Sequence, residues 1–134
     1  MTQLLSIGAQ VPLVVRKSEA RGRGVYAAAP IAEGTLIERC AVIVVPPEEV
    51  ETINKTRLGN YHFQWGGTRD ASAVALGFGS LYNHAHDPNA IYVRRFEDEV
   101  IEFVSLRDIA EGEEITVSYN GAIGDDRPVW FEVR

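Results

Sequence analysis

The chain has 134 residues, of which 46% are hydrophobic and 24% charged, a composition typical of a single globular domain. Its formal net charge of −6 argues against nucleic acid as the main partner and favours a basic peptide or protein. The single cysteine, Cys40, excludes an intrachain disulfide and a cysteine-based zinc cage. Because no apolar run reaches the roughly 18 residues of a membrane span and the start lacks a signal-peptide pattern, we expect an intracellular protein that crosses no membrane.

Short runs rich in β-branched residues, separated by glycine and proline turns, predict a mainly β domain. In the first half of the chain we expect strands at 11–16, 25–28 and 35–45, with a glycine turn at 21–24. The end of the third strand, Ala41–Val45, is apolar throughout, which predicts burial on both faces. Pro46 and Pro47 stop it. One or two helical turns are expected at Glu48–Asn54, where acids at the start complement the helix dipole.

The second half of the chain continues with short strands. Tyr61–Trp65 alternates aromatic and polar residues, as a half-buried strand does. Residues 73–78 are small and mostly apolar, and residues 90–96 and 100–106 flank an acidic turn and predict a hairpin. The last clear strand is expected at 114–119. No internal repeat or linker stands out, so one domain over residues 1–134 is predicted.

The densest group of polar residues is the stretch Leu81–Tyr92. It holds an Asn-His pair, a Pro-Asn turn and a tyrosine between apolar runs. Such a stretch indicates a functional site carried by a loop rather than a core strand. Pro88 restricts the preceding residue to extended geometry and Asn89 tolerates a turn, so the loop is expected to lead into a strand.

Taken singly, these residues have plain structural interpretations. Gly22-Arg23-Gly24 is as readily a turn as a cofactor loop, and no third glycine opens a helix as in dinucleotide sites. Asn83 and His84 are also residues that satisfy buried backbone groups. His84, His86 and Asp87 could mimic a metal site, but no other histidine is near in sequence, and we expect no metal.

Taken together, three motifs resemble those of the SET domain of protein-lysine methyltransferases. Residues 21–27, Arg-Gly-Arg-Gly-Val-Tyr-Ala, resemble its N-terminal glycine motif. Residues 83–90, Asn-His-Ala-His-Asp-Pro-Asn-Ala, resemble its Asn-His motif, and residues 113–119, Glu-Glu-Ile-Thr-Val-Ser-Tyr, its final tyrosine motif. The order and spacing match the family over about residues 11–119, and the compact viral members are the most similar.

The resemblance implies a β-clip fold of small curled sheets with few short helices. In this fold the segment after the Asn-His motif threads through a loop and forms a C-terminal pseudoknot. A core at about 11–119 would be followed by a tail at 120–134 on the cofactor and substrate side. The implied activity is methyl transfer from S-adenosylmethionine to a lysine in a basic segment of a protein, such as a histone tail. The implied product of the cofactor is S-adenosylhomocysteine.

The resemblance also implies a role for each matching residue. The catalytic residue is Tyr119, which orients the lysine amine and polarises the methyl. The residues that bind the cofactor are Gly22, Arg23, Gly24, Asn83, His84 and Trp130, with Phe131 as the alternative to Trp130. The residues that line the lysine channel are Tyr61, Phe78, Tyr92 and Cys40. A narrow apolar channel suits this chemistry, because burial disfavours the ammonium and favours the neutral amine that attacks the methyl.

Two departures from the family pattern leave another function open. Ala85 replaces the usual serine of the Asn-His motif, and the aromatic residue that often follows Tyr119 is missing at Asn120. These departures favour, as the alternative, a weak or inactive SET-like module that binds protein or cofactor without turnover. The resemblance further implies a homodimer paired through Ala41–Val45, whereas burial of this stretch in the core is the plain alternative.

Overall fold

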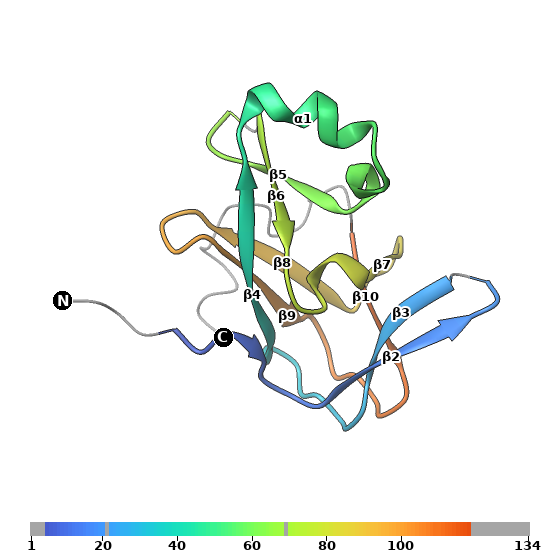
Figure 1. The fold of residues 1–134 in the computed structure, drawn as a ribbon. Coiled ribbons are helices and arrows are strands. Elements are labelled where there is room, and N and C mark those ends of the chain that lie inside the picture. Colours follow the sequence, from blue (N-terminus) through green and yellow to red (C-terminus); the bar gives the residue numbers. More distant parts are fainter. Residues whose placement is uncertain (1–4, 21, 69, 119–134) are drawn as a thin grey trace.

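The computed structural model describes residues 5–20, 22–68 and 70–118, and Figure 1 shows the arrangement of their elements. In chain order these are β1 Gly8–Ala9, β2 Leu13–Ser18, β3 Gly22–Ala27, β4 Leu36–Val45, α1 Pro47–Asn54, η1 Arg57–Asn60, β5 His62–Trp65, β6 Ala71–Ala75, η2 Gly79–Leu81, β7 Asn83–His84, β8 Ala90–Arg95, β9 Val100–Ser105 and β10 Glu114–Val117. The described strands form a six-stranded sheet, β5-β6-β4-β9-β8 with β1 on β4, and a four-stranded sheet, β2-β3-β10-β7. The predicted mainly β fold of small sheets is confirmed.

The long strand β4 organises the larger sheet, because its first half pairs with β9 and its second half with β6. Its β-branched residues suit this position. The register shifts between Leu36 and Glu38, so that one extra residue of β4 stands opposite β9. A bulge of this kind re-aims side chains. Here the successive side chains of Ile37 and Glu38 are both buried, at 0% and 1% exposure.

The far end of β4 departs from the prediction that Ala41–Val45 is buried on both faces. Ile43 is 56% exposed and Val44 is 36% exposed, whereas Val45 is buried. The prediction was wrong because successive residues of a strand point to opposite faces of the sheet, and Ile43 and Val44 are both exposed, so neither face is fully covered at this end of β4. The chain then enters α1, with Pro47 at its start and two glutamates in its first turn. No described helix is long and apolar enough to span a bilayer.

The glycine motif lies on a strand and not in the turn predicted at 21–24. Gly22 pairs with Ser18 and Gly24 with Arg16, in the antiparallel pair of β2 and β3. One other strand also begins and ends at different residues than predicted. The strand predicted at 73–78 is β6 at Ala71–Ala75, because Gly77 adopts a φ of +70° and turns the chain. The predicted hairpin is confirmed as β8 and β9.

The last described strand, β10, lies between β3 and β7 (Figure 1). It pairs antiparallel with β3 and parallel with β7, where Thr116 stands beside Asn83 and Val117 beside His84. Parallel neighbours cannot be joined by a tight turn, and the β8–β9 hairpin lies between these two in the chain. The third sequence motif is therefore inserted between the first two, which is the arrangement that the implied pseudoknot requires.

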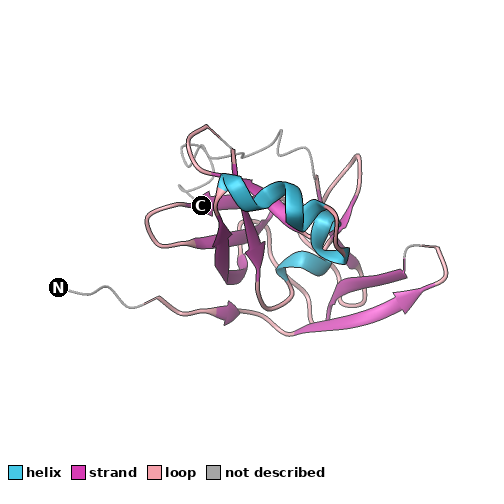
Figure 2. Ribbon diagram, turned by 45° about the horizontal axis from the view of Figure 1, so that its top comes forward, coloured by secondary structure: helices cyan, strands magenta, loops and turns pink. Residues whose placement is uncertain are grey.

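The larger sheet curls so that its edge strands β5 and β8 approach each other. The Nε atom of Arg94 on β8 donates a hydrogen bond to the carbonyl of Gln64 on β5 at 2.7 Å. The rings of Phe63 and Tyr92 meet edge to face, with centroids 5.0 Å apart. Figure 2 shows the longest described helix, α1, lying across one side of the sheets. The space between β5 and β8 is thus enclosed by side chains from both edges.

The turn before β10 is closed by the carboxylate of Glu113. The backbone N–H of Ala110 donates to its Oε1 atom at 2.9 Å, and Arg107 and Asn89 donate to its Oε2 atom at 3.1 and 3.2 Å. The hydrogen bond from Ala110, supported by Arg107 and Asn89, lowers the pKa of Glu113 below its ordinary value of 4.5. Glu113 therefore stabilises the fold in its charged form.

We expect a Glu113→Gln variant to lose less stability on acidification than the wild type. Because the native pKa lies below the unfolded value, the stabilisation is full above about pH 4.5 and is lost as the pH falls through the lower native pKa. The measurement is the melting temperature of both proteins from about pH 7 to about pH 3. The variant should melt lower than the wild type at neutral pH, with the difference shrinking in acid. A difference that is constant with pH would contradict this role of Glu113.

Candidate active site

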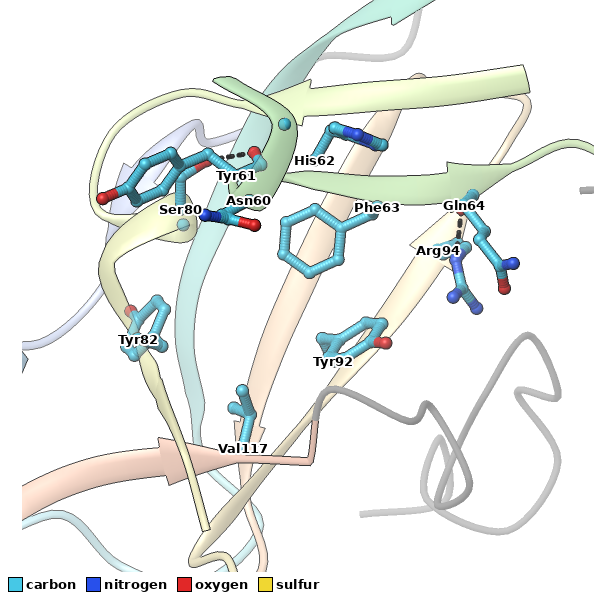
Figure 3. A pocket seen from close by; sticks show the side chains of 12 residues that line it. Asn60, Tyr61, His62, Phe63, Gln64, Ser80, Tyr82, Tyr92, Arg94 and Val117 are labelled. Atoms are coloured by element: carbon cyan, nitrogen blue, oxygen red, sulfur yellow. Dashed lines mark hydrogen bonds between the residues drawn. The ribbon is translucent and has the colours of Figure 1, made fainter. Parts of the chain in front are cut away.

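Two pockets of about 200 Å³ each share one wall. The first, here called the aromatic pocket, is lined by Gly59, Asn60, Tyr61, His62, Phe63, Gln64, Gly79, Ser80, Tyr82, Tyr92, Arg94 and Val117 (Figure 3). The second, here called the glycine pocket, is lined by Gly22, Arg23, Asn60, Tyr61, Ser80, Leu81 and Asn83. Asn60, Tyr61 and Ser80 line both and form the shared wall. Each pocket is smaller than the roughly 300–1,000 Å³ of sites for drug-sized ligands.

The centre of the aromatic pocket is built by rings from the two edge strands. Figure 3 shows Phe63 of β5 and Tyr92 of β8 facing each other, with Arg94 and Gln64 at one end. Tyr92 is 4% exposed, and the guanidinium carbon of Arg94 lies 5.2 Å from the centre of its ring. A guanidinium at this distance is attracted to an aromatic face. Together with the bond to the Gln64 carbonyl, this contact fixes the orientation of Tyr92.

The shared wall is tied to the strand that precedes it. The single hydrogen of the Ser80 hydroxyl is within reach of two carbonyl acceptors, that of Ala75 at 3.0 Å and that of Tyr61 at 3.2 Å. Next to it, Tyr82 is 1% exposed and stacks on Phe103 with centroids 4.3 Å apart. Burial, followed by the nearby carboxylate of Glu38, raises the pKa of Tyr82 well above its ordinary value. Tyr82 therefore contributes a neutral phenol to the pocket.

The glycine pocket is held together by the side chain of Asn83. Its Nδ2 atom donates to the carbonyl of Arg23 at 2.9 Å and to the Oε2 atom of Glu114 at 2.7 Å. A Cβ at Gly24 would collide with that Glu114 oxygen and lie 2.9 Å from Asn83 Nδ2. Only glycine at position 24 leaves this contact intact. Gly22, by contrast, has a φ of +73° and lines the pocket, and a Cβ at this position would meet nothing within 4 Å.

The two histidines of the Asn-His motif lie next to the site without lining either pocket. Their rings meet edge to face, with centroids 5.4 Å apart. His84 stands beside Val117 in the parallel pair of β7 and β10, and the N–H of Ala85 donates to the Val117 carbonyl at 3.0 Å. Within residues 5–118 as described, no group of three His, Cys, Asp or Glu side chains is placed to hold a metal.

The structure brings most of the predicted site residues together. Those that line a pocket are Gly22, Arg23, Asn83, Tyr61 and Tyr92. Gly24 and His84 lie directly behind, in contact with Asn83 and Val117 respectively. Tyr119 and Trp130, the predicted catalytic and adenine-covering residues, lie outside the described residues, as does Phe131.

The other two predicted channel residues, Cys40 and Phe78, are not among the described residues that line either pocket. Cys40 is 2% exposed and packs behind the wall, since a Cβ at Gly79 would lie only 2.8 Å from its sulfur. Burial, more than the nearby Glu38 carboxylate, raises the pKa of the Cys40 thiol and keeps it neutral. Phe78 packs against the core cluster at the start of η2.

Several lining residues were not singled out from the sequence, and they include Asn60, Phe63, Ser80, Tyr82 and Arg94. Phe63 and Tyr82 carried a weak signal, since Phe63 lies two residues after the predicted channel residue Tyr61 and Tyr82 directly precedes Asn83. Arg94 carried none. Its role depends on the approach of β5 and β8, which are far apart in the chain.

Comparison with known proteins agrees with this arrangement. Residues 22–120 match the model of the SET domain. The chain belongs to the SET domain family. It is 36% identical over 122 residues to the H3 lysine-37-specific histone-lysine N-methyltransferase of Schizosaccharomyces pombe, an alignment that covers 90% of this chain and 78% of the relative. The predicted enzyme class, protein-lysine methyltransferase, is thereby confirmed for this SET domain.

Solved structures of SET domain proteins have the same fold. A Plasmodium falciparum protein described as a candidate histone methyltransferase superposes with a TM-score of 0.68 at 27% identity, covering 82% of this chain and 94% of that one. The Neurospora histone lysine methyltransferase DIM-5 superposes with a TM-score of 0.66 at 21% identity, covering 84% of this chain and 53% of that one. The curled sheets of this SET domain are therefore those of its family.

Proposed function

We propose that this SET domain transfers a methyl group from S-adenosylmethionine to the side-chain amine of a lysine in a basic segment of a protein. The observation that carries the proposal is the wall of Asn60, Tyr61 and Ser80, which borders both pockets. A methyl donor in the glycine pocket and an amine in the aromatic pocket would approach each other at this wall. Alignment of two reactants at near-attack distance supplies much of the acceleration of such a transfer.

The glycine pocket fits the amino-acid end of S-adenosylmethionine. The backbone of Gly22, the backbone of Arg23 and the polar side chain of Asn83 suit an ammonium and a carboxylate. We propose that Trp130 covers the adenine ring of the cofactor and that His84 contacts the edge of that ring. When bound, the cofactor supplies an electrophilic methyl on a sulfonium, so the reaction needs neither a metal nor a covalent intermediate.

The aromatic pocket suits a lysine side chain. Its small volume and its walls of Phe63 and Tyr92 match one extended, mostly apolar chain. The attacking amine must be neutral, and with a reference pKa of about 10.4 its deprotonation at pH 8 costs about 3 kcal/mol in water. Apolar walls reduce that cost because they disfavour the ammonium. We assign the orientation of the amine to the hydroxyl of Tyr119, two residues after the pocket residue Val117.

Negative charge on the surface favours a basic substrate. The chain carries a net charge of −6, and Glu48 and Glu49 are exposed in the first turn of α1. Such a surface attracts a segment rich in lysine and arginine. Histone tails are the basic segments that we propose as the first substrates to examine, since the fission yeast relative is named for a histone H3 lysine.

The test is transfer of a labelled methyl from S-adenosylmethionine to histones and to lysate proteins at about pH 9, closer to the lysine pKa of about 10.4. Mass spectrometry then locates the label. We expect label on lysine side chains and a rate that rises with pH. Absence of transfer with cofactor binding intact would favour the alternative, a binding module without turnover. Absence of both methyl transfer and cofactor binding would refute the proposal, and only the assignment of the fold would then stand.

A further inference from the structure

A buried carboxylate lies behind both pockets without lining either. Glu38 on β4 is 1% exposed, and no ion pair reaches it from the described residues. Removing a carboxylate from water is costly unless hydrogen bonds replace the lost solvation. Glu38 has these bonds: the N–H of Phe78 donates to its Oε2 atom at 2.9 Å, and the hydroxyl of Tyr82 donates to its Oε1 atom at 2.7 Å.

Both donors belong to residues 77–83, here called the wall segment. This segment supplies Ser80 to the shared wall, Tyr82 to the aromatic pocket and Asn83 to the glycine pocket. Asn60 and Tyr61 also border both pockets, but among the described segments only the wall segment gives each pocket residues that the other pocket lacks. The position of the wall segment therefore sets the shape of the cofactor site and of the lysine site at once.

The wall segment lies directly on the carboxylate. A Cβ at Gly77 would be 2.5 Å from Glu38 Oε2, and Gly77 has a φ of +70°, a conformation that other residues rarely adopt. Two residues later, a Cβ at Gly79 would be 2.7 Å from Ala75 Cβ. The two glycines thus allow an approach that leaves no room for the segment to shift toward β4.

We propose that Glu38 is a positioning residue that holds the wall segment in the one arrangement that serves both pockets. The inference deepens the proposed function and rests on it for the identity of the two sites. Glu38 touches neither substrate nor cofactor, and acts through Phe78 and Tyr82. An apolar residue of similar size would fill the same space, but it would leave the Phe78 N–H and the Tyr82 hydroxyl without their acceptor.

The test compares Glu38→Leu, Glu38→Gln and Tyr82→Phe with the wild type. Glu102→Leu is the control, because Glu102 is a partly buried acid on the neighbouring strand β9, with its side chain 14% exposed, that bonds Arg39 and Arg95 and lines neither pocket. Three quantities are measured well below every melting temperature: hydrogen exchange at 77–83, the Kd of S-adenosylmethionine, and the kcat and KM of methyl transfer.

We expect Glu38→Leu to speed exchange of the Phe78 amide by about tenfold, the factor that corresponds to one lost hydrogen bond of about 1.4 kcal/mol. In the same variant, the Kd of S-adenosylmethionine should rise and kcat/KM should fall by a similar factor. Glu102→Leu should lose stability but keep its exchange, Kd and kcat/KM unchanged. Glu38→Gln should restore a large part of all three quantities, since its oxygen can still accept from Phe78 while its amide can donate to the oxygen of Tyr82 but no longer accepts from the Tyr82 hydroxyl. Tyr82→Phe keeps the ring and should reproduce a part of the loss.

The proposal is overturned if Glu38→Leu changes only the melting temperature, or if Glu102→Leu alters exchange, Kd and kcat/KM to the same extent. Should Glu38→Leu not fold, Tyr82→Phe decides: wild-type exchange and kcat/KM in that variant would also overturn it. Hydrogen exchange does not depend on catalysis. If the wild type transfers no methyl at all, the proposed function fails while the exchange data still decide whether Glu38 holds the wall segment.

Discussion

A Tyr119→Phe variant is expected to lose about 10²-fold or more of kcat, the usual cost of removing one preorganised hydrogen-bonding group from an active site. The substitution removes the hydroxyl that we assign to the reacting amine and keeps the aromatic ring. Binding of S-adenosylmethionine should therefore change little. The measurement is kcat in the labelled-methyl assay together with the cofactor Kd by calorimetry.

The matched control is Tyr26→Phe. Tyr26 lies on β3, contacts Arg16 at 5.5 Å from its ring centre, and lines neither pocket. It should keep kcat within about twofold of the wild type, because the substitution removes a hydroxyl that lines neither pocket. Equal activity of Tyr119→Phe and the wild type would refute the role assigned to Tyr119. A loss of cofactor binding as large as the loss of kcat would place Tyr119 in the cofactor site instead.

A Gly24→Ala variant should bind S-adenosylmethionine at least about tenfold more weakly, which corresponds to about 1.4 kcal/mol. The new methyl collides with Glu114 Oε2, so the carboxylate must move away from Asn83. Asn83 then loses a charge-assisted hydrogen bond that joins β7 to β10, and its position in the glycine pocket is no longer fixed. Stability should fall by about 1–3 kcal/mol, as in other overpacked sites. Calorimetry and thermal unfolding measure the two effects.

Gly67→Ala is the control for this experiment, because a Cβ at Gly67 meets nothing within 4 Å and its φ is not positive. It should behave as the wild type in both measurements. Unchanged cofactor affinity in Gly24→Ala would mean that the contact of Gly24, Asn83 and Glu114 does not shape the cofactor site. A variant that loses stability but keeps its affinity would assign the contact to folding alone.

The two predictions concern residues that are connected through β10. Asn83 connects the glycine motif on β3 to Glu114 on β10, and β10 leads through Val117 toward Tyr119. The third motif therefore carries both Glu114, which bonds Asn83 beside the proposed cofactor site, and the proposed catalytic hydroxyl. This explains why β10 must lie between β3 and β7, since no other order of these strands would place Glu114 beside both Gly24 and Asn83.

Much of this protein could be predicted from local sequence. Glycine pairs, prolines and β-branched runs mark turns and strands through short-range sterics, so the hairpin of β8 and β9 and the long strand β4 followed from their residues. The three motifs also predicted the SET domain fold, because each combines rare residue types in a fixed order. The motifs also single out Gly22, Arg23 and Asn83, which line one pocket together in the structure.

The tertiary structure alone decided which side chains face the pockets. Arg94 and Phe63 meet because the sheet curls and brings β5 to β8, and no local pattern encodes that closure. Cys40 lies behind Gly79, because the close approach of the chain at Gly79 places the backbone of η2 over its sulfur. In the sequence, nothing distinguishes Glu38 from an ordinary charged residue of a strand. Its burial under the wall segment depends on contacts between residues some forty positions apart, and such contacts form only when the whole chain folds.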